Sequence, residues 1–451
     1  MDAAALLSFC QELVGRAVDA GADEAEVAVC AERQIESTLE GDAIHTVQSH
    51  DETVFGLRLL RDGAQGFVTA NDIDQRTLGE SVGEALDQAR LNPPDSFNGL
   101  PEPSEYRGIE GLYDEEMSRI GVDDSTRIAS TLLERVHQHD RRVRVDSGSV
   151  SFSVMTSAIA SSKGVALVED RTNAQGYLFG MAVDGDDIAS FDYDGESSCT
   201  ISDFEAKLLE AADRFSEKCL MGLAASGGES FCGTVLLSPD AVAEFLLPSL
   251  TTALCADAVR KGQSPLAGKV GEAIAAPQFT LVDDATLPGQ VASSAFDREG
   301  VPTRRFVLVK DGILQGYLYN HYEARAAGGG VQSTGHASGG AGSPPGIGPT
   351  FLDLAAGEQA NEDLVCAGER AVVVNRFSGS TNPVNGDFSG VVKNGFLLSG
   401  GERRAIKEVL IAGNLFDALR GVSAGSRERR LIGGTRLVPT LRIEGVSVTA
   451  G

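Results

Sequence analysis

The stretch that most constrains the fold of this chain covers residues 375–420. Its first part, SGSTNPVNGDFSG, is crowded with Gly, Asn, Asp, Ser and Pro, residues that favour turns. Apolar runs follow, separated by Asn-Gly at 394–395 and Gly-Gly at 400–401, and such dipeptides are typical of tight hairpins. Asn414 is a suitable N-cap for a short helix over residues 415–419. The stretch therefore predicts a polar loop held between the strands of a buried sheet.

The rest of the chain predicts an α+β fold: two helix–strands–helix units, then a β-rich C-terminal domain with a mostly antiparallel sheet. Proline recurs between residues 93 and 103, and Ala-Ala-Ser-Gly-Gly occupies 224–228; both are linker signals. We therefore expect domains at 1–100, 115–223 and 229–451.

Apolar residues at helical spacing and alternating runs predict the individual elements. The expected helices cover residues 3–20, 78–89, 125–137, 204–220 and 238–261. The expected strands cover residues 25–30, 34–39, 53–60, 66–70, 143–160, 164–189, 233–237, 306–309 and 313–317. Asp124 or Ser125 is expected to cap the third helix, and Ser238 the fifth, with Pro239 at its first position. Residues 328–348, rich in Gly, Ser and Pro, predict a long loop.

The net charge limits the kinds of partner. The chain carries 65 acidic against 38 basic residues, a formal net charge of −27. A surface that binds nucleic acid needs a basic face, so we expect no direct contact with nucleic acid.

Cysteine usage and hydropathy point to the cytoplasm. Seven cysteines are scattered without a CxxC pair, which suits a reducing compartment. The first 18 residues read as an amphipathic helix and not a signal peptide, and no run of 18 apolar residues predicts a membrane span.

Two blocks of motifs carry a resemblance to a known family. NPVNGDFSG, followed by a hairpin and by EVLIAGNLFDALR, is similar to the C-terminal signature of the TldD/PmbA family. FDREGVP at 296–302 agrees with it, as do GYLY at 316–319 and STG at 333–335. The similarity runs from about Gly21 to the last expected strand. Members of this family are called modulators of DNA gyrase or TldD/TldE-type metalloproteases.

The resemblance also shows what this chain lacks. Catalytic TldD-type members carry HExxxH on the helix after the first strand of the third unit, where two histidines bind zinc and the glutamate activates water. Aligned on the shared Arg-Lys-Gly ending, the histidine positions fall on Leu247 and Thr252, and the glutamate position on Pro248. A further cysteine ligand of the family also has no counterpart, because no cysteine follows Cys366. We expect no catalytic residue, no metal and no cofactor in this chain.

The resemblance therefore implies a TldE/PmbA-like subunit. Its partner would be a TldD-type HExxxH paralogue that holds the zinc, and the pair would cleave peptides or unfolded proteins in the cytoplasm. The alternative is a non-proteolytic binding or scaffold protein that forms a homodimer. A metal-independent hydrolase is a third alternative.

Polar loops are the candidates for a substrate cleft. Amides and backbone N–H groups hold an extended peptide well, and residues 378–389 and 328–348 offer both. The expected cleft residues are Asn382, Asn385, Asp387, Ser389 and His336. For each residue of the turn, the alternative is that it satisfies only the turn's own backbone. For His336 we favour a structural role over a ligand contact.

Other chemical signals in the sequence predict structure more than catalysis. His137 and His139 lie near a helix end, and His321 follows a hairpin, where packing or capping is enough. Gly-Val-Ser-Ala-Gly at 421–425 matches a nucleophile motif but lacks the strand–turn–helix context that this motif needs. The clustered carboxylates Asp283, Asp284, Asp297 and Glu299 have catalytic pairing as one interpretation, but acidic residues in turns of a chain with net charge −27 need no such role.

Overall fold

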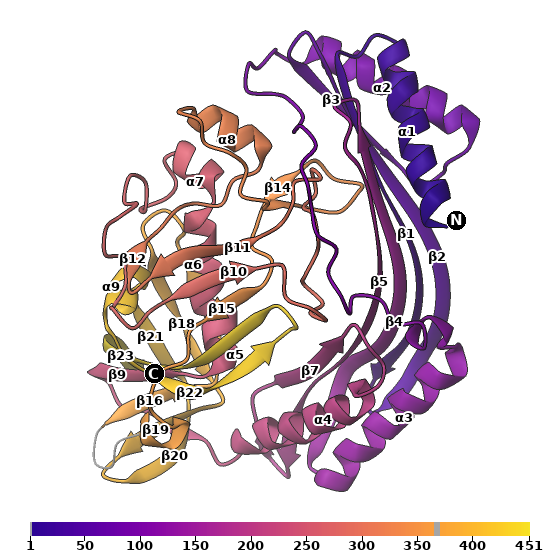
Figure 1. The fold of residues 1–451 in the computed structure, drawn as a ribbon. Helices are drawn as coiled ribbons and strands as arrows, with labels where there is room; N and C mark the ends of the chain where they lie inside the picture. The colour runs from indigo at the N-terminus through magenta and orange to yellow at the C-terminus, as the bar shows by residue number, and fades with distance from the viewer. Residues whose placement is uncertain (1, 365–369) are drawn as a thin grey trace.

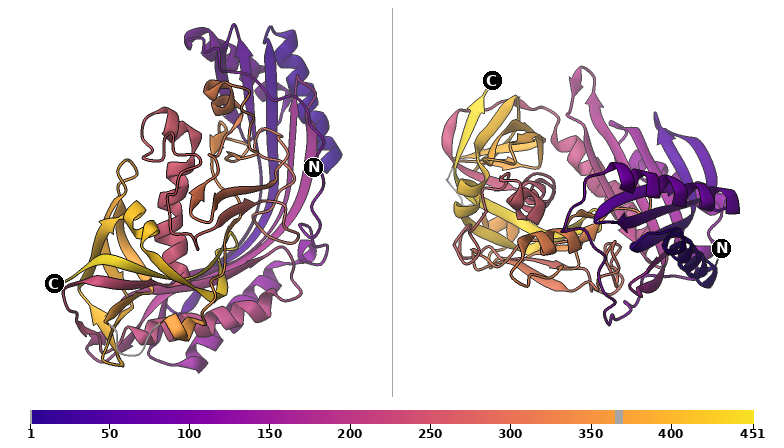
Figure 2. Two further views of the ribbon diagram at one scale, coloured as in Figure 1. Left: turned by 60° about the vertical axis from the view of Figure 1, so that its left-hand side comes forward. Right: turned by 90° about the horizontal axis from the view of Figure 1, so that it is seen from above.

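A computed structural model describes residues 2–364 and 370–451 of the chain. Two bodies lie side by side: a long, curved N-terminal sheet backed by helices, and a β-rich C-terminal body on the concave side of that sheet (Figure 1 and Figure 2). Most strand pairs are antiparallel, so the predicted α+β class with a β-rich C-terminal domain is confirmed. Cys366 lies outside the described residues.

The N-terminal sheet has seven strands in the order β3-β2-β1-β4-β5-β6, with β7 also paired to β5. β1 and β4 run antiparallel from the pair Glu26 and Ser161 to the pair Glu40 and Ser147. The strands of the two predicted N-terminal units thus lie in one sheet, and whether either unit folds alone stays a prediction. The strands are β1 (Glu24–Glu40), β2 (Ala43–Arg61), β3 (Ala64–Ala70), β4 (Val143–Ser161), β5 (Ala166–Asp184), β6 (Asp187–Ile188) and β7 (Asp192–Ser198).

Four helices cover the convex face of this sheet because its strands alternate. Val27 and Leu39 of β1 pack toward the helices, whereas Ala28 packs with Phe296 of the C-terminal body. The helices are α1 (Ala3–Asp19), α2 (Gln75–Leu91), α3 (Val122–His139) and α4 (Phe204–Met221), and a short 3₁₀ turn precedes α3 at Met117–Arg119. Among the described residues, no helix is long and apolar enough to cross a membrane.

The predicted cap of α3 is wrong. The N-cap is Gly121, and the Asp124 carboxylate accepts the Gly121 N–H at 3.1 Å from inside the first turn. Ser125 is buried, and its hydroxyl lies 2.8 Å from that of Ser37 on β1. The helix begins earlier because an acidic residue in the first turn can satisfy a free N–H from the third helical position.

The C-terminal body contains a fourteen-stranded sheet whose main path runs β12-β11-β10-β15-β23-β9-β16-β19-β20-β8. Its strands are β8 (Ser226–Gly227), β9 (Phe231–Leu237), β10 (Leu281–Asp284), β11 (Arg305–Lys310), β12 (Ile313–Leu314), β15 (Leu352–Leu354), β16 (Ala371–Val374), β17 (Arg376–Thr381), β18 (Asp387–Lys393), β19 (Gly395–Ser399), β20 (Glu402–Lys407), β21 (Val409–Asn414), β22 (Val422–Ile432) and β23 (Arg436–Ala450). The shorter elements are β13 (Ala337–Ser338), β14 (Gly346–Ile347), α8 (His321–Ala327), α9 (Leu415–Arg420) and a 3₁₀ turn at Asn361–Leu364.

Two of the local features predicted for this body are present in the structure, and one is not. The Gly-Gly pair at 400–401 joins β19 and β20 with positive φ angles, and Asn414 caps α9 by accepting the Phe416 N–H; both are confirmed. The hairpin expected at residues 394–395 is wrong, because β18 pairs with β17 and β21 while β19 pairs with β16 and β20. Asn394 instead lies at φ 48°, and its amide donates to Asp192 of the N-terminal sheet. The Asn-Gly sequence by itself gives no sign that this amide is buried against the N-terminal sheet.

The helix expected over residues 238–261 is divided in the structure. Ser238 caps it as predicted, and α5 (Pro239–Ala241), a π-helical segment (Val242–Leu246), α6 (Leu247–Leu254) and α7 (Ala256–Arg260) follow. Cys255 separates the last two with an extended backbone at ψ 130°. There the Leu318 N–H donates to Leu254, and the Ala256 N–H donates to Leu318, so a neighbouring segment takes the place of helical hydrogen bonds.

A buried network of four charges joins the two bodies. Arg58 of β2 contacts Glu26 of β1 at 2.8 Å and Glu299 of the C-terminal body at 2.9 Å. Arg298 contacts Glu26 at 3.0 Å, and the Glu299 carboxylate also accepts the His321 N–H at 2.7 Å. Burial by itself lowers the pKa of Arg58, but the two carboxylates raise it above its ordinary value. The guanidinium therefore stays charged inside the protein.

Arg58→Met is expected to lower the free energy of unfolding by about 3–5 kcal/mol, because it leaves Glu299 buried without a cation. Chemical denaturation measures the change. Arg90→Met is the matched control: its ion pair with Asp87 is exposed, and its removal should cost no more than about 1 kcal/mol. Equal effects of the two substitutions would mean that the network does not hold the bodies together.

Candidate functional site

The candidate site is centred on the helical segment of residues 239–260, which contains the three positions expected to align with the family's HExxxH segment. Leu247 is fully buried in the core of the C-terminal body, and Pro248 is partly buried beside it. Thr252 is exposed, and its hydroxyl donates to the Pro248 carbonyl at 2.9 Å. None of the three side chains offers a nitrogen, sulfur or carboxylate ligand for zinc. Within the part of the chain that the structure describes, no group of three or more His, Cys, Asp or Glu residues is arranged to hold a metal ion.

A cavity of about 250 Å³ opens at the N-terminal end of this helix, between it and the N-terminal sheet. We call it the Glu244 cavity. Strands β5 and β7 form one wall, α5 and the π-helical segment a second, and β22 and β23 a third. Its lining includes Tyr177, Tyr193, Asp194, Asp240, Glu244, Arg430 and Arg436.

The aspartates of this cavity are fully paired. The Asp194 side chain is buried and contacts Lys218 at 2.9 Å, Arg214 at 3.0 Å and Arg430 at 2.5 Å. Burial alone would raise the pKa of Asp194, but these three cations hold it below its usual range. Asp240 contacts the same Lys218 at 3.1 Å and Arg430 at 3.2 Å. The cluster ties β7, α4, α5 and β22 together.

Glu244 lies in the same cavity and has a different environment. Its carboxyl makes no hydrogen bond or ion pair with any residue in the described ranges 2–364 and 370–451. Burial raises the pKa of Glu244 to about 7, and Arg376 and Arg436 only partly oppose the shift. The group therefore changes charge near neutral pH.

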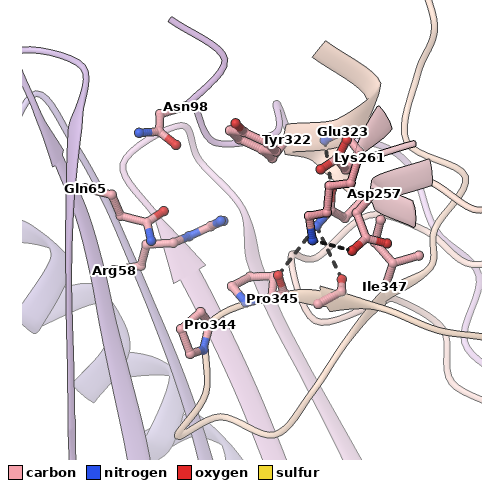
Figure 3. A pocket seen from close by; sticks show the side chains of 13 residues that line it. Arg58, Gln65, Asn98, Asp257, Lys261, Tyr322, Glu323, Pro344, Pro345 and Ile347 are labelled. Atoms are coloured by element: carbon pink, nitrogen blue, oxygen red, sulfur yellow. Dashed lines mark hydrogen bonds and ion pairs between the residues drawn. The ribbon is translucent and has the colours of Figure 1, made fainter. Parts of the chain in front are cut away.

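A second cavity, of about 320 Å³, lies at the C-terminal end of the helix, and we call it the Tyr322 cavity (Figure 3). Its charges are paired: Lys261 contacts Asp257 at 2.8 Å, and Glu323 accepts two hydrogen bonds of 2.7 Å from Arg260. The Tyr322 hydroxyl donates to Asp95 at 2.7 Å. Its other lining residues are Arg58, Gln65, Asn98, Gly99, Asn320, Pro344, Pro345, Gly346 and Ile347.

With this geometry established, comparison with known proteins identifies the family. The PmbA/TldA metallopeptidase C-terminal domain matches residues 232–450, and the PmbA/TldA metallopeptidase domain 1 matches residues 25–92. The chain belongs to the PmbA/TldD family. The predicted family is therefore confirmed.

Relatives of both types found in the PmbA/TldD family match nearly the whole chain. The crystal structure of TldE from Thermococcus kodakarensis superposes with a TM-score of 0.87 at 25% identity, covering 98% of this chain and all of that one. An uncharacterised protein of Methanocaldococcus jannaschii is 29% identical, over 88% of this chain and 90% of its own length. Haemophilus influenzae has a metalloprotease PmbA homologue, 26% identical over 93% of this chain and 90% of its own, and a metalloprotease TldD homologue, 24% identical over 85% and 81%.

In this PmbA/TldD-family chain, the turn expected to border a substrate cleft is held by its own side chains. The side-chain carbonyl of Asn382 accepts the Val384 N–H at 2.9 Å. Asn385 donates to Asp387 at 2.8 Å, and Asn414 donates to Asp387 at 3.0 Å. These bonds satisfy the turn, as the alternative interpretation of each residue expects. The side chains of Asn382, Asn385, Asp387 and Ser389 are nevertheless exposed. The cleft assignment stays a prediction.

His336 is buried. Only 2% of it is exposed, its Nδ1 lies 2.9 Å from the Thr334 hydroxyl, and its Nε2 lies 3.6 Å from Asp283. The Gly-rich loop around it contains the β13–β14 pair, and its residues 339–341 and 344–347 line two cavities against the N-terminal sheet. Neither of those two cavities includes a residue from 378–389.

The clustered carboxylates hold local structure, but the expected turn is wrong for Asp283 and Asp284, which end strand β10. Asp284 accepts the Thr286 hydroxyl at 2.6 Å. Asp283 accepts the Thr350 and Phe351 N–H groups, and Asp297 accepts three backbone N–H groups. Glu299 belongs to the network with Arg58.

Sequence reasoning missed Glu244, Arg376 and Arg436. One signal was available: Glu244 interrupts the apolar run Val-Ala-Glu-Phe-Leu-Leu, and a lone carboxylate in such a run is either buried or faces a cavity. Arg376 and Arg436 begin two strands that are distant in sequence and show no comparable signal.

Glu244→Gln is expected to raise the melting temperature at pH 8 and to leave it nearly unchanged at pH 5. The folded-state pKa of about 7 lies above the ordinary value of 4.5, so the folded protein binds more protons than the unfolded chain between these pH values. Stability from this group is therefore lost as pH rises from about 4.5 to 7, and glutamine does not titrate. Thermal unfolding at pH 5, 6, 7 and 8 tests this. The exposed Glu134→Gln is the control, and a pH-independent effect of Glu244→Gln would contradict the prediction.

Proposed function

We propose that this chain is the TldE/PmbA-type, non-catalytic subunit of a cytoplasmic peptidase complex that cleaves peptides or unfolded proteins. Its partner is a TldD-type chain that carries HExxxH and the zinc. One observation carries the proposal: Leu247, Pro248 and Thr252 occupy the positions where the family's catalytic members have two histidines and a glutamate.

The chemistry of zinc peptidases explains why this observation matters. A catalytic zinc needs three protein ligands and an open position for water, and a nearby base must take the proton from that water. Leucine and proline offer neither function, and the threonine hydroxyl already donates to a backbone carbonyl. A single substitution could be compensated by a neighbour, but two ligand positions and the base position have changed together.

The family also supports the expected pairing. Haemophilus influenzae has relatives of both the PmbA and the TldD type, as a two-subunit complex requires. We expect the C-terminal body to supply most of the contact with the partner, and such obligate interfaces bury on the order of 2,000 Å² or more. A homodimeric scaffold without proteolytic activity is the outcome that the experiments below separate from this proposal.

The purified chain is expected to bind no stoichiometric zinc, and its mixture with the TldD-type chain of the same genome is expected to bind about one zinc per pair. Metal analysis after gel filtration measures both. Peptide cleavage should require the partner and should be lost on chelation, because the zinc generates the attacking hydroxide. About one zinc in the isolated chain would contradict the proposal, and so would failure of the two chains to associate at micromolar concentration.

Ser389→Ala is expected to lower kcat/KM of the complex about two- to tenfold without changing the melting temperature. No hydrogen bond of this hydroxyl is formed within the described chain, so its removal costs only a contact with substrate, of about 0.5–1.5 kcal/mol. Asn382→Ala and Asp387→Ala remove bonds of the turn and should lower the melting temperature as well. Asn71→Ala, at an exposed site of the N-terminal body, is the control. Unchanged cleavage by the Ser389 variant would place this turn outside the cleft.

A further inference from the structure

Arg436 is a half-buried cation that has no carboxylate partner. It lines the Glu244 cavity, and none of its guanidinium nitrogens is bonded to any residue that the structure describes. Burial lowers the pKa of Arg436, and the nearby Glu244 only partly offsets this. A desolvated charge without a partner is costly, so a site that keeps one is unusual in a protein with so many free carboxylates.

A second arginine is incompletely satisfied close by. Arg376 of β17 lies with its guanidinium carbon 5.6 Å from the centre of the Tyr193 ring, and its Nη1 is buried without a hydrogen-bond partner. It is one of the charges that act on Glu244. Two arginines with unused donors therefore lie around one carboxyl.

The other charged side chains that line the cavity form ion pairs. Arg430 is held by Asp194 and Asp240, and Glu196 contacts Arg214 at 2.6 Å. Among the described residues that line this cavity, the charged side chains without a partner are Glu244 and Arg436, and Arg376 acts on Glu244 from outside the lining. With Glu244 protonated, the free charge is positive, which favours an anion as the ligand.

The kind of anion follows from the shape and the donors. A guanidinium binds a carboxylate through two parallel hydrogen bonds, and a protonated carboxyl can donate a third. Tyr177, 40% exposed, and Tyr193 offer aromatic surface for the apolar part of a residue. A cavity of about 250 Å³ is smaller than most small-molecule sites and suits one amino-acid residue.

We propose that the Glu244 cavity binds a carboxylate of a peptide ligand, with Arg436 as the principal contact and Arg376 as a supporting charge. Only one part of this inference rests on the proposed function, namely that the ligand is a peptide. The carboxylate is either the C-terminus or an aspartate or glutamate side chain, since both present the same group.

Binding is expected to weaken as pH rises through 7. Glu244 then ionises, and its negative charge both repels the ligand and attracts Arg436. The charges that face Glu244 are those of Arg376 on β17, Arg436 on β23 and Asp192 on β7; Asp240 lies one turn earlier in its own helix. Glu244→Gln should remove this pH dependence.

Calorimetric titration of the full chain with three N-acetylated hexapeptides of Ala and Ser tests the proposal at pH 6. One peptide has a free C-terminus, one is amidated, and one is amidated with an internal Asp. We expect at least one carboxylate peptide to bind about tenfold or more tightly than the neutral one, and the pattern identifies the source of the carboxylate. Arg436→Gln should remove this difference with no loss of thermal stability, because no described residue is hydrogen-bonded to or ion-paired with its guanidinium.

Arg427→Gln, an exposed arginine of β22 outside the cavity, is the matched control and should bind like the wild type. Equal affinity of the wild type and Arg436→Gln would overturn the proposal, and so would equal binding, or no binding, of all three peptides. These titrations need neither the partner nor cleavage. A complex that fails to cleave peptides therefore counts against the proposed function and leaves the carboxylate site standing.

Discussion

The relation between the two bodies depends on a buried charge network. Arg58 extends from the N-terminal sheet to Glu299 of the C-terminal body, and Arg298 of that body extends back to Glu26. Each charge has an opposite charge within 3.0 Å, so the network is stable only when both bodies are in place. Both cavities described above lie between these bodies. Arg58 of this network lines the Tyr322 cavity, and the Asp194 cluster joins the two bodies at the Glu244 cavity.

The helical segment of residues 239–260 has a cavity at each end. In its middle, Leu247 is buried in the core and Thr252 is exposed, and neither side chain is of a type that binds zinc. At its C-terminal end the charges of the Tyr322 cavity are paired. At its N-terminal end Glu244 and Arg436 are not. Replacing unpaired buried charges by apolar residues would add stability, so the presence of this pair is the physical reason to look for a ligand there.

The extent to which the sequence predicted this structure differs between elements. Ser238 and Asn414 cap helices as expected, because a cap depends on one side chain and the N–H groups two or three residues later. Asn394 failed as a hairpin signal because its amide is bound by Asp192 from the other body. Cys255 breaks a helix whose apolar spacing continues, since Leu318 supplies the backbone partners. Each failure involves a contact between segments far apart in the chain.

The sequence by itself determined the α+β class, the family and the absence of HExxxH, because these depend on periodicity, on turn residues and on the identity of residues at fixed spacing. Tertiary structure alone decided which charges are satisfied. Nothing in the order of residues distinguishes Arg430, held by two aspartates, from Arg436, which no carboxylate within residues 2–364 and 370–451 holds. Pairing of charges requires distances of a few ångströms, and those distances arise only when β7, α5 and β23 meet in the folded protein.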